Sequence, residues 1–181
     1  MRIYGNRQLQ TLPGLATRPT SARVREAIFN IWQSEISGCH WLDLCAGNGS
    51  MGAEALCRGA KEVIGIEQSA RACKIIQQNW QKFSQPQQKF TVLRGDVRKR
   101  LATLQGQQFD RIYFDPPYAS ELYRPVLDAI AQLHLLHPTA ELAVEHNPSQ
   151  WQTISVHGLE IVREKVYGNT AVTFYEVKAE S

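Results

Sequence analysis

The sequence lacks the signals of several protein classes. Its 181 residues contain four cysteines, none in a C-x-x-C pair, so free thiols are expected rather than a zinc site or disulfides. No apolar run approaches the roughly 18 residues of a membrane span, and no apolar segment follows the charged N-terminus as in a secretory signal. Internal repeats and low-complexity tracts are also missing. These absences predict a soluble, cytoplasmic protein without a metal or a membrane partner.

The basic side chains are unevenly distributed. Hydrophobic residues make up 43% of the chain and charged residues 20%, with a net charge of +3, which suits one globular domain. The first 26 residues hold five arginines against one glutamate, whereas the rest is nearly neutral. A basic segment on a neutral body favours a polyanionic partner, although a solvated surface would have the same composition. The candidate RNA-binding residues are Arg2, Arg7, Arg18, Arg23 and Arg25.

The N-terminal segment is expected to form a small arm. Residues 2–4 and 9–12 read as two short strands of a hairpin, and such a hairpin alone is marginal in water, so it must pack against the body or a ligand. We therefore divide the chain into a basic hairpin arm over residues 1–17 and one domain over residues 18–181. A helix is expected to follow, with Thr20 or Ser21 as its N-cap and Arg23 and Arg25 off its apolar stripe.

Strands and helices alternate along the rest of the chain, which predicts β-α-β units and a parallel sheet. The last stretch instead reads as a β-hairpin around residues 168–169. The fold class is α/β, with seven mostly parallel strands, helices on both faces and a C-terminal antiparallel hairpin. The expected strands are 40–46, 62–67, 89–94, 109–114, 140–145, 159–167 and 170–177, and the expected helices are 53–58, 69–83, 97–104 and 121–134.

A glycine-rich turn follows the first of these strands. Gly47, Gly49 and Gly52 match the G-x-G-x-x-G pattern of nucleotide-binding turns, and Glu67 ends the next strand twenty residues after Gly47. Glycines let the backbone approach a ligand closely, and an acid at the next strand end can accept hydrogen bonds from ribose hydroxyls. This pattern alone predicts a nucleoside and does not say which one.

Four acids mark the ends of four consecutive strands: Asp43, Glu67, Asp96 and Asp115. Each alone could simply cap the following helix. An NAD-linked oxidoreductase would not specifically require Asp43 or Asp115. S-adenosylmethionine (AdoMet) would use all four, with Asp43 near the methionine end, Glu67 on the ribose and Asp96 on the adenine amine.

The box Asp-Pro-Pro-Tyr occupies residues 115–118, directly after an apolar strand. Pro116 biases Asp115 toward an extended conformation, as expected where a chain leaves a sheet. Ligands of open α/β sheets bind beyond the carboxyl ends of strands. The box therefore predicts an active-site corner; the alternative is a strand-terminating turn with Tyr118 on the surface.

Together, these motifs resemble those of Rossmann-like, AdoMet-dependent amino-methyltransferases. With Arg-Pro-Thr at 18–20, Val-Arg-Glu-Ala-Ile-Phe-Asn at 24–30 and Glu-Ala-Leu at 54–56, the chain looks like the bacterial 16S rRNA guanine-N2 methyltransferases of the RsmD type almost from end to end. The Asp-Pro-Pro-Tyr box is shared with DNA adenine methyltransferases and specifies only the chemistry. Cys45 replaces the family's usual aromatic residue, and Asn48 its usual Ser or Thr.

The resemblance implies a class I methyltransferase fold, AdoMet as co-substrate, no metal, and 16S rRNA or a partly assembled small ribosomal subunit as substrate. It implies Asp115, Pro116 and Tyr118 as catalytic residues. The implied cofactor-binding residues are Asp43, Ala46, Gly47, Gly49, Glu67, Gln68, Asp96, Val97 and Thr20. No heptad or long exposed apolar stripe indicates an oligomer, so a monomer is expected.

The implied mechanism is one of orientation. The Asp115 carboxylate and the Pro116 carbonyl would accept the two N–H groups of a guanine amine, while Tyr118 stacks on the extruded base. Two alternatives stay open: a DNA adenine or cytosine amino-methyltransferase, for which the short arm leaves little room, and a non-catalytic RNA-binding assembly factor. Arg163, Lys165 and Tyr167 can line the same face, although ordinary solvent-exposed strand residues are the favoured interpretation there.

Overall fold

The computed structural model describes residues 1–13, 22–118 and 120–180. Its helices are α1 (Ala22–Ile31), α2 (Ser50–Cys57), α3 (Ala70–Phe83), α4 (Val97–Ala102) and α5 (Tyr123–Gln132), with short 3-10 turns η1 (Tyr4–Asn6) and η2 (Gln33–Glu35). Its strands are β1 (Arg2–Ile3), β2 (Arg7–Gln8), β3 (His40–Leu44), β4 (Glu62–Glu67), β5 (Lys89–Arg94), β6 (Phe109–Phe114), β7 (Leu136–His146), β8 (Leu159–Tyr167) and β9 (Thr170–Val177).

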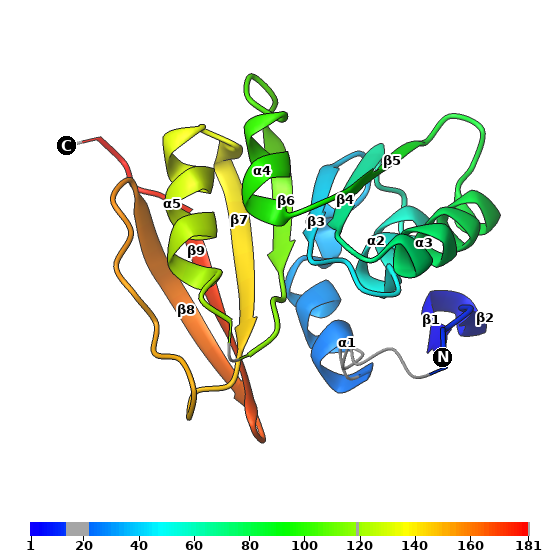
Figure 1. Cartoon of the computed structure of the whole chain (residues 1–181), viewed down its shortest axis with the longest axis horizontal. Helices are drawn as coiled ribbons and strands as arrows, with labels where there is room; N and C mark the ends of the chain where they lie inside the picture. Colours follow the sequence, from blue (N-terminus) through cyan, green and yellow to red (C-terminus); the bar gives the residue numbers. More distant parts are fainter. Residues whose placement is uncertain (14–21, 119, 181) are drawn as a thin grey trace.

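One seven-stranded sheet forms the centre of the molecule, in the order β5-β4-β3-β6-β7-β9-β8 (Figure 1). Its first five members pair in parallel, and β9 runs antiparallel to both β7 and β8. The order reverses between β3 and β6, where crossovers on opposite sides of the sheet leave a crevice at the carboxyl ends. The predicted fold class is confirmed: an α/β sheet, mostly parallel, with a C-terminal antiparallel hairpin.

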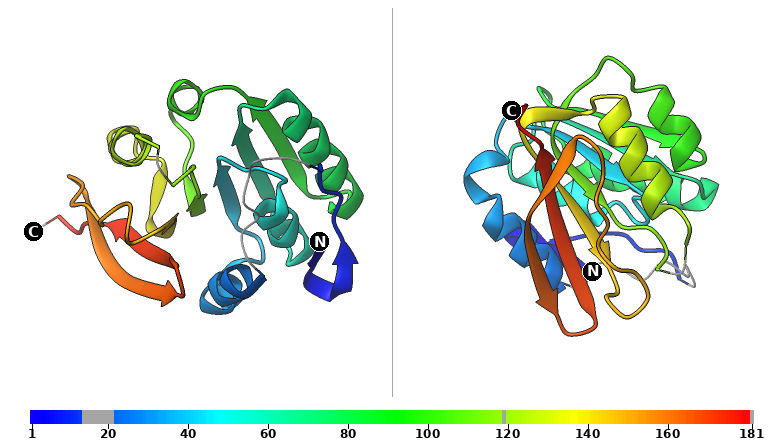
Figure 2. Two further views of the ribbon diagram at one scale, coloured as in Figure 1. Left: turned by 60° about the horizontal axis from the view of Figure 1, so that its bottom comes forward. Right: turned by 90° about the vertical axis from the view of Figure 1, so that its left-hand side faces the viewer.

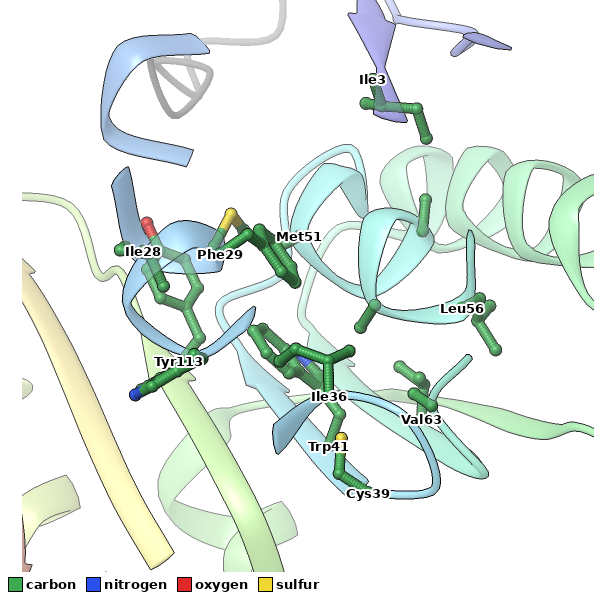
Figure 3. Packing of buried hydrophobic residues seen from close by; sticks show 14 of the residues in the cluster. Ile3, Ile28, Phe29, Ile36, Cys39, Trp41, Met51, Leu56, Val63 and Tyr113 are labelled. Atoms are coloured by element: carbon green, nitrogen blue, oxygen red, sulfur yellow. The ribbon is translucent and has the colours of Figure 1, made fainter. Parts of the chain in front are cut away.

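Helices cover both faces of the sheet (Figure 2). One core contains the apolar side chains of α1, α2 and α3, and the other contains those of α4 and α5. Figure 3 shows the first core, where Phe29 of α1 and Met51 of α2 gather over Trp41 of β3. The rings of Phe29 and Trp41 stack with centroids 5.2 Å apart. This packing fixes α1 and α2 against the strand that leads into the glycine turn.

The N-terminal hairpin is docked on α3, as its marginal size required. Ile3 and Leu9 are buried in the first core. The buried Asn79 of α3 accepts a hydrogen bond from Gln10 N (3.0 Å) and donates to Gln10 O (3.0 Å). The hairpin prediction is confirmed but its second strand was misplaced: β2 is Arg7–Gln8 rather than 9–12, because Leu9 turns inward and Gln10 pairs with a side chain.

Several element ends also differ from expectation. The first sheet strand ends at Leu44 rather than 46, and α2 already begins at Ser50. Strand β7 starts four residues before the expected 140, because Leu136 pairs with Phe109 before a register shift. The predicted caps Thr20 and Ser21, the boundary between residues 17 and 18, and Arg18 all lie outside the described residues.

Candidate active site

A cavity of about 430 Å³ opens at the carboxyl edge of the sheet. It lies between the turn after β3, the ends of β4 and β5, and the segment after β6. Its size falls within the range of small-molecule and cofactor sites. The sheet order explains the location, since β3 and β6 flank the point where the crossovers diverge.

The turn after β3 is held by Glu67 at the end of β4. One carboxylate oxygen, Oε2, accepts from Gly47 N (2.8 Å), and the other, Oε1, accepts from Ser69 N (3.0 Å). Glu67 is 8% exposed and lines the cavity. Each oxygen keeps a second lone pair, so Glu67 can fix the turn and still accept from a ribose.

Asp43 lies deeper and is buried on β3. Its Oδ2 accepts from Gly52 N at 3.1 Å. Burial raises the pKa of Asp43 well above its usual range, and the nearby Glu67 charge raises it further, against the Gly52 N–H, which lowers it. A cationic ligand would favour the charged form of this carboxyl. The floor of the cavity therefore suits a ligand that carries positive charge.

The glycines of the turn serve two different purposes. Gly47 lines the cavity with φ +60°. A Cβ on Gly49 would lie 2.9 Å from Trp80 Nε1, and one on Gly52 would lie 2.3 Å from the Trp80 ring. Trp80 of α3 also donates to Gly49 O at 2.8 Å. Gly49 and Gly52 therefore leave room for Trp80. Gly47 and Gly49 were expected to make room for a ligand, and of these two only Gly47 lines the cavity.

Asp96 follows β5 and caps α4. It accepts from Arg98 N (2.8 Å), and the Arg98 guanidinium approaches it at 3.0 and 2.7 Å. These hydrogen bonds with Arg98, above all the side-chain one, lower the pKa of Asp96 to about 2. Asp96 is thus both a helix cap and a cavity-lining carboxylate that stays charged over the whole neutral range.

The Asp-Pro-Pro-Tyr segment forms the other side of the cavity. Asp115 N donates to Leu44 O at 3.3 Å, which ties the segment to the end of β3. The Tyr118 hydroxyl is 3.1 Å from Thr170 Oγ1 at the start of β9. Asp115, Pro116 and Tyr118 all line the cavity, so the segment is a wall of the site and not merely a turn at the surface.

All four predicted acids line the same cavity, and all four lie close enough to Cys45 to affect its thiol. Its thiol is half-buried beside the cavity, and its pKa is raised by burial and then by the charges of four carboxylates: Glu67, Asp115, Asp43 and Asp96. Cys45 has a φ of +59°, a conformation that is rare outside glycine, asparagine and aspartate. Proximity of four acids from four strands was the central sequence prediction, and the structure confirms that proximity.

Of the predicted cofactor residues, the cavity contains Asp43, Ala46, Gly47, Glu67, Gln68, Asp96 and Val97, while Thr20 lies outside the described residues. The cavity also contains Cys45 and Asn48, the two departures from the family pattern that bear on the fit of the cofactor. Its other members were not predicted: Ser50, Met51, Ile66, Gly95, Arg98, Tyr113, Pro117 and Leu122. Most of these residues are adjacent in sequence to the predicted motifs and could have been included on that ground. Tyr113, Met51 and Leu122 read as ordinary core residues, and only the fold places them at the site.

The predicted RNA-binding arginines do not behave alike. Arg2, Arg7 and Arg23 are exposed. Arg25 is 3% exposed and forms an ion pair with Glu54 of α2 (2.6 Å), while its other nitrogen donates to Arg2 O (2.7 Å). The prediction that Arg25 faces RNA is wrong, because its charge joins α1, α2 and the arm inside the molecule.

The family described as Conserved hypothetical protein 95 matches residues 1–176. The chain belongs to this family. A Bacillus subtilis relative, provisionally named rRNA methyltransferase YlbH, is 31% identical over 94% of this chain and 93% of its own length. Ribosomal RNA small subunit methyltransferase D of Haemophilus influenzae is 29% identical over 92% and 91%.

A solved structure from Escherichia coli, provisionally named methyltransferase yhhF, superimposes with a TM-score of 0.86 at 28% identity, covering 99% of both chains. The family is the RsmD type of class I methyltransferases, which confirms the resemblance and the fold. Across the described ranges, no helix is long and apolar enough to span a membrane, and no three His, Cys, Asp or Glu side chains gather as metal ligands.

Proposed function

We propose that the protein transfers a methyl group from AdoMet to the exocyclic N2 amine of a guanine in 16S rRNA, within naked RNA or a partly assembled small subunit. The observation that carries this proposal is the placement of Asp115 and Pro116 in the wall of the acid-lined cavity, with Tyr118 beside them. Relatives named as small-subunit rRNA methyltransferases support the choice of RNA.

The residues of the cavity fit AdoMet. Glu67, Asp96, Asp43 and Gly47 all line the cavity. In this proposal Glu67 accepts from the ribose, Asp96 accepts from the adenine amine, and Asp43 and Gly47 border the methionine end. When bound, AdoMet supplies a methyl group on a positively charged sulfur, which is reactive without a metal.

The work of the protein is then to orient the amine. A guanine amine is a poor nucleophile because its lone pair is delocalised into the ring. The Asp115 carboxylate and the Pro116 carbonyl accept its two N–H groups and turn the nitrogen lone pair toward the methyl donor. Such positioning can contribute about 7–11 kcal/mol of the barrier reduction. The proton leaves after transfer, when the nitrogen has become acidic, and the Asp115 carboxylate, which in this proposal already accepts an N–H of the amine, can take it.

Tyr118 provides a surface for the extruded base. Its hydroxyl contact with Thr170 (3.1 Å) fixes the ring at the edge of the cavity. Stacking on an aromatic ring contributes about 1–3 kcal/mol per base, which offsets the few kcal/mol needed to extrude the base. The exposed Arg2, Arg7 and Arg23 would neutralise phosphates and make binding salt-sensitive.

One experiment tests both which nucleic acid is methylated and which atom of the base receives the methyl group. The protein is incubated with methyl-labelled AdoMet and either small subunits lacking rRNA methylation, protein-free 16S rRNA, or DNA, and the label is then mapped to a nucleoside. We expect labelled N2-methylguanosine in rRNA. Label on DNA alone, or on adenine or cytosine, would replace this proposal with a DNA or a different amino-methyltransferase; no label on any substrate would favour the assembly factor.

A further inference from the structure

A second basic and aromatic surface borders the active site. We propose that Arg23 of α1 with Lys165 and Tyr167 of β8, here called the flank platform, binds the RNA nucleotides next to the target guanine. This inference rests on the proposed function and extends it to a part of the chain far from the arm. Lys165 and Tyr167 lie near the tip of the β8–β9 hairpin, which reaches past the ends of β6 and β7 (Figure 1), and Arg23 lies beside it on α1.

Strand register places the platform on the active-site face. Phe114 pairs with Val144, Val144 with Thr173, and Thr173 with Glu164. The next residue of each strand points to the opposite face, so Asp115 and Lys165 project from the same side of the sheet. Three strand spacings of about 4.8 Å separate them, or roughly 14 Å. Lys165 is therefore within reach of a nucleotide that flanks a base held at Asp115.

The platform is also continuous with Tyr118. Tyr167 pairs directly with Thr170 across the hairpin, and Thr170 Oγ1 lies 3.1 Å from the Tyr118 hydroxyl. Opposite residues of an antiparallel pair have Cβ atoms about 4.5–5.5 Å apart. Two aromatic rings thus follow one another from the cavity wall to the hairpin tip, with Thr170 between them.

The chemistry of the platform fits single-stranded RNA. The Arg23 guanidinium lies over the Tyr167 ring, 5.8 Å from its centroid. Arg23 and Lys165 are exposed, and neither has a carboxylate ion-pair partner among the described residues. Bases stack on aromatic rings and on guanidinium planes, and lysine attracts phosphate. An acidic protein surface is a less suitable partner, because it would use the two positive charges but would not use the Tyr167 ring.

Arg163 shows which basic residue of this strand is already used. Its NH2 lies 2.5 Å from Glu141 Oε1, and its guanidinium covers Phe174 at 5.0 Å. The charge of Arg163 is therefore neutralised within the fold, whereas the charge of Lys165 is left for a ligand. Of the strand residues that the sequence placed on this face, only Lys165 and Tyr167 belong to the platform.

The first test removes one charge. Lys165→Gln is compared with Lys178→Gln, which removes an exposed lysine after the far end of β9. Binding of unmethylated 16S rRNA is measured at several salt concentrations, and AdoMet binding is measured separately. For Lys165→Gln we expect weaker RNA binding and a slope of log affinity against log salt that is shallower by about 0.7, with AdoMet affinity unchanged. Lys178→Gln should match the unmodified protein.

The second test separates stacking from packing. Tyr167→Phe keeps the ring and should bind RNA as the unmodified protein does. Tyr167→Leu keeps apolar contact with the core but has no ring, and should weaken binding by about 5- to 100-fold with little change in thermal midpoint. If both variants and Lys165→Gln bind and methylate normally, the platform is wrong while the proposed function stands. If the unmodified protein does not methylate rRNA at all, the proposed function itself fails.

Discussion

The two walls of the cavity are built in different ways. On the cofactor wall, Asp43 and Glu67 are buried, and their oxygens accept from backbone N–H groups of the glycine turn. On the transfer wall, residues 115–118 follow the end of β6 and lean through Tyr118 on the β8–β9 hairpin. The acids of the cofactor wall therefore stabilise the fold as well as line the cavity, whereas Asp115 lies beyond the end of β6.

This difference predicts how each wall responds to substitution. A change on the cofactor wall disturbs packing and AdoMet binding together, because the same groups serve both. A change on the transfer wall should alter the rate and leave stability and AdoMet binding nearly intact. Separate measurements of the free energy of unfolding, AdoMet affinity and methyl transfer can confirm or break the comparison.

The largest effect is expected for Asp115→Ala. If the Asp115 carboxylate orients the amine as proposed, its loss should lower the single-turnover rate of rRNA methylation by about 10³-fold, comparable to removal of a preorganised polar group in other enzymes. AdoMet affinity, measured by calorimetry, should change less than threefold, on the order of 0.6 kcal/mol. Asp128→Ala, on the exposed part of α5, controls for loss of an aspartate.

A collapse of AdoMet binding in Asp115→Ala would assign this carboxylate to the cofactor instead of the amine. The contrast between the walls would then disappear, because both would hold AdoMet. A normal rate would remove Asp115 from the mechanism altogether.

Behind the cofactor wall, where Gly52 packs against Trp80, Gly52→Ala should lower the free energy of unfolding by about 1–3 kcal/mol, as overpacking does. The new Cβ would lie 2.3 Å from the Trp80 ring, and the ring is held by its bond to Gly49 O. Urea unfolding measures the loss. In a Trp80→Phe background the added methyl should cost less, because the smaller ring leaves room. Additive losses in the double variant would show that Trp80 is not the cause.

The sequence predicted what depends on local pattern. Alternating strands and helices placed Asp43, Glu67, Asp96 and Asp115 at one edge, and parallel strands bring such ends together. It could not predict which glycines face a ligand, because that depends on Trp80, which lies 28 residues after Gly52 and belongs to another helix.

Arg25 shows that the exposure of a charged side chain is equally hard to predict from the sequence. Helical periodicity placed Arg25 off the apolar stripe of α1, which usually means exposure. The position is covered by Glu54 of α2 and by the arm, whose backbone accepts from Arg25. Burial of a charge beside a partner distant in sequence is a tertiary event that a one-dimensional pattern does not contain.

A smaller effect is expected for Glu67→Gln. The amide can accept from Gly47 N or from Ser69 N but not from both, because its NH2 group is a donor. Loss of one charge-assisted bond and of the charge near AdoMet should weaken AdoMet binding by about tenfold, or 1.4 kcal/mol. Glu62→Gln, at the other end of β4 and outside the cavity, is the matched control for loss of a glutamate charge and should leave AdoMet affinity unchanged. Unchanged AdoMet affinity in Glu67→Gln would leave Glu67 with a structural role only.

The smallest effect is expected for Arg98→Gln. This variant separates the ion pair of Asp96 with the Arg98 side chain from its role as the cap of α4. The variant removes the guanidinium but keeps the Arg98 backbone N–H that the cap requires. The pKa of Asp96 lies near 2, below its ordinary value of 3.8, so any stability from this pair is present above pH 4 and is lost as the pH falls toward 2. In the variant, the Asp96 pKa followed by NMR should rise toward 3.8. Since the Arg98 side chain is more than half exposed, stability at neutral pH should hardly change.

A pKa that stays near 2 would attribute the shift to the helix cap, and Asp96 would then belong with Glu67 among the acids held by backbone N–H groups.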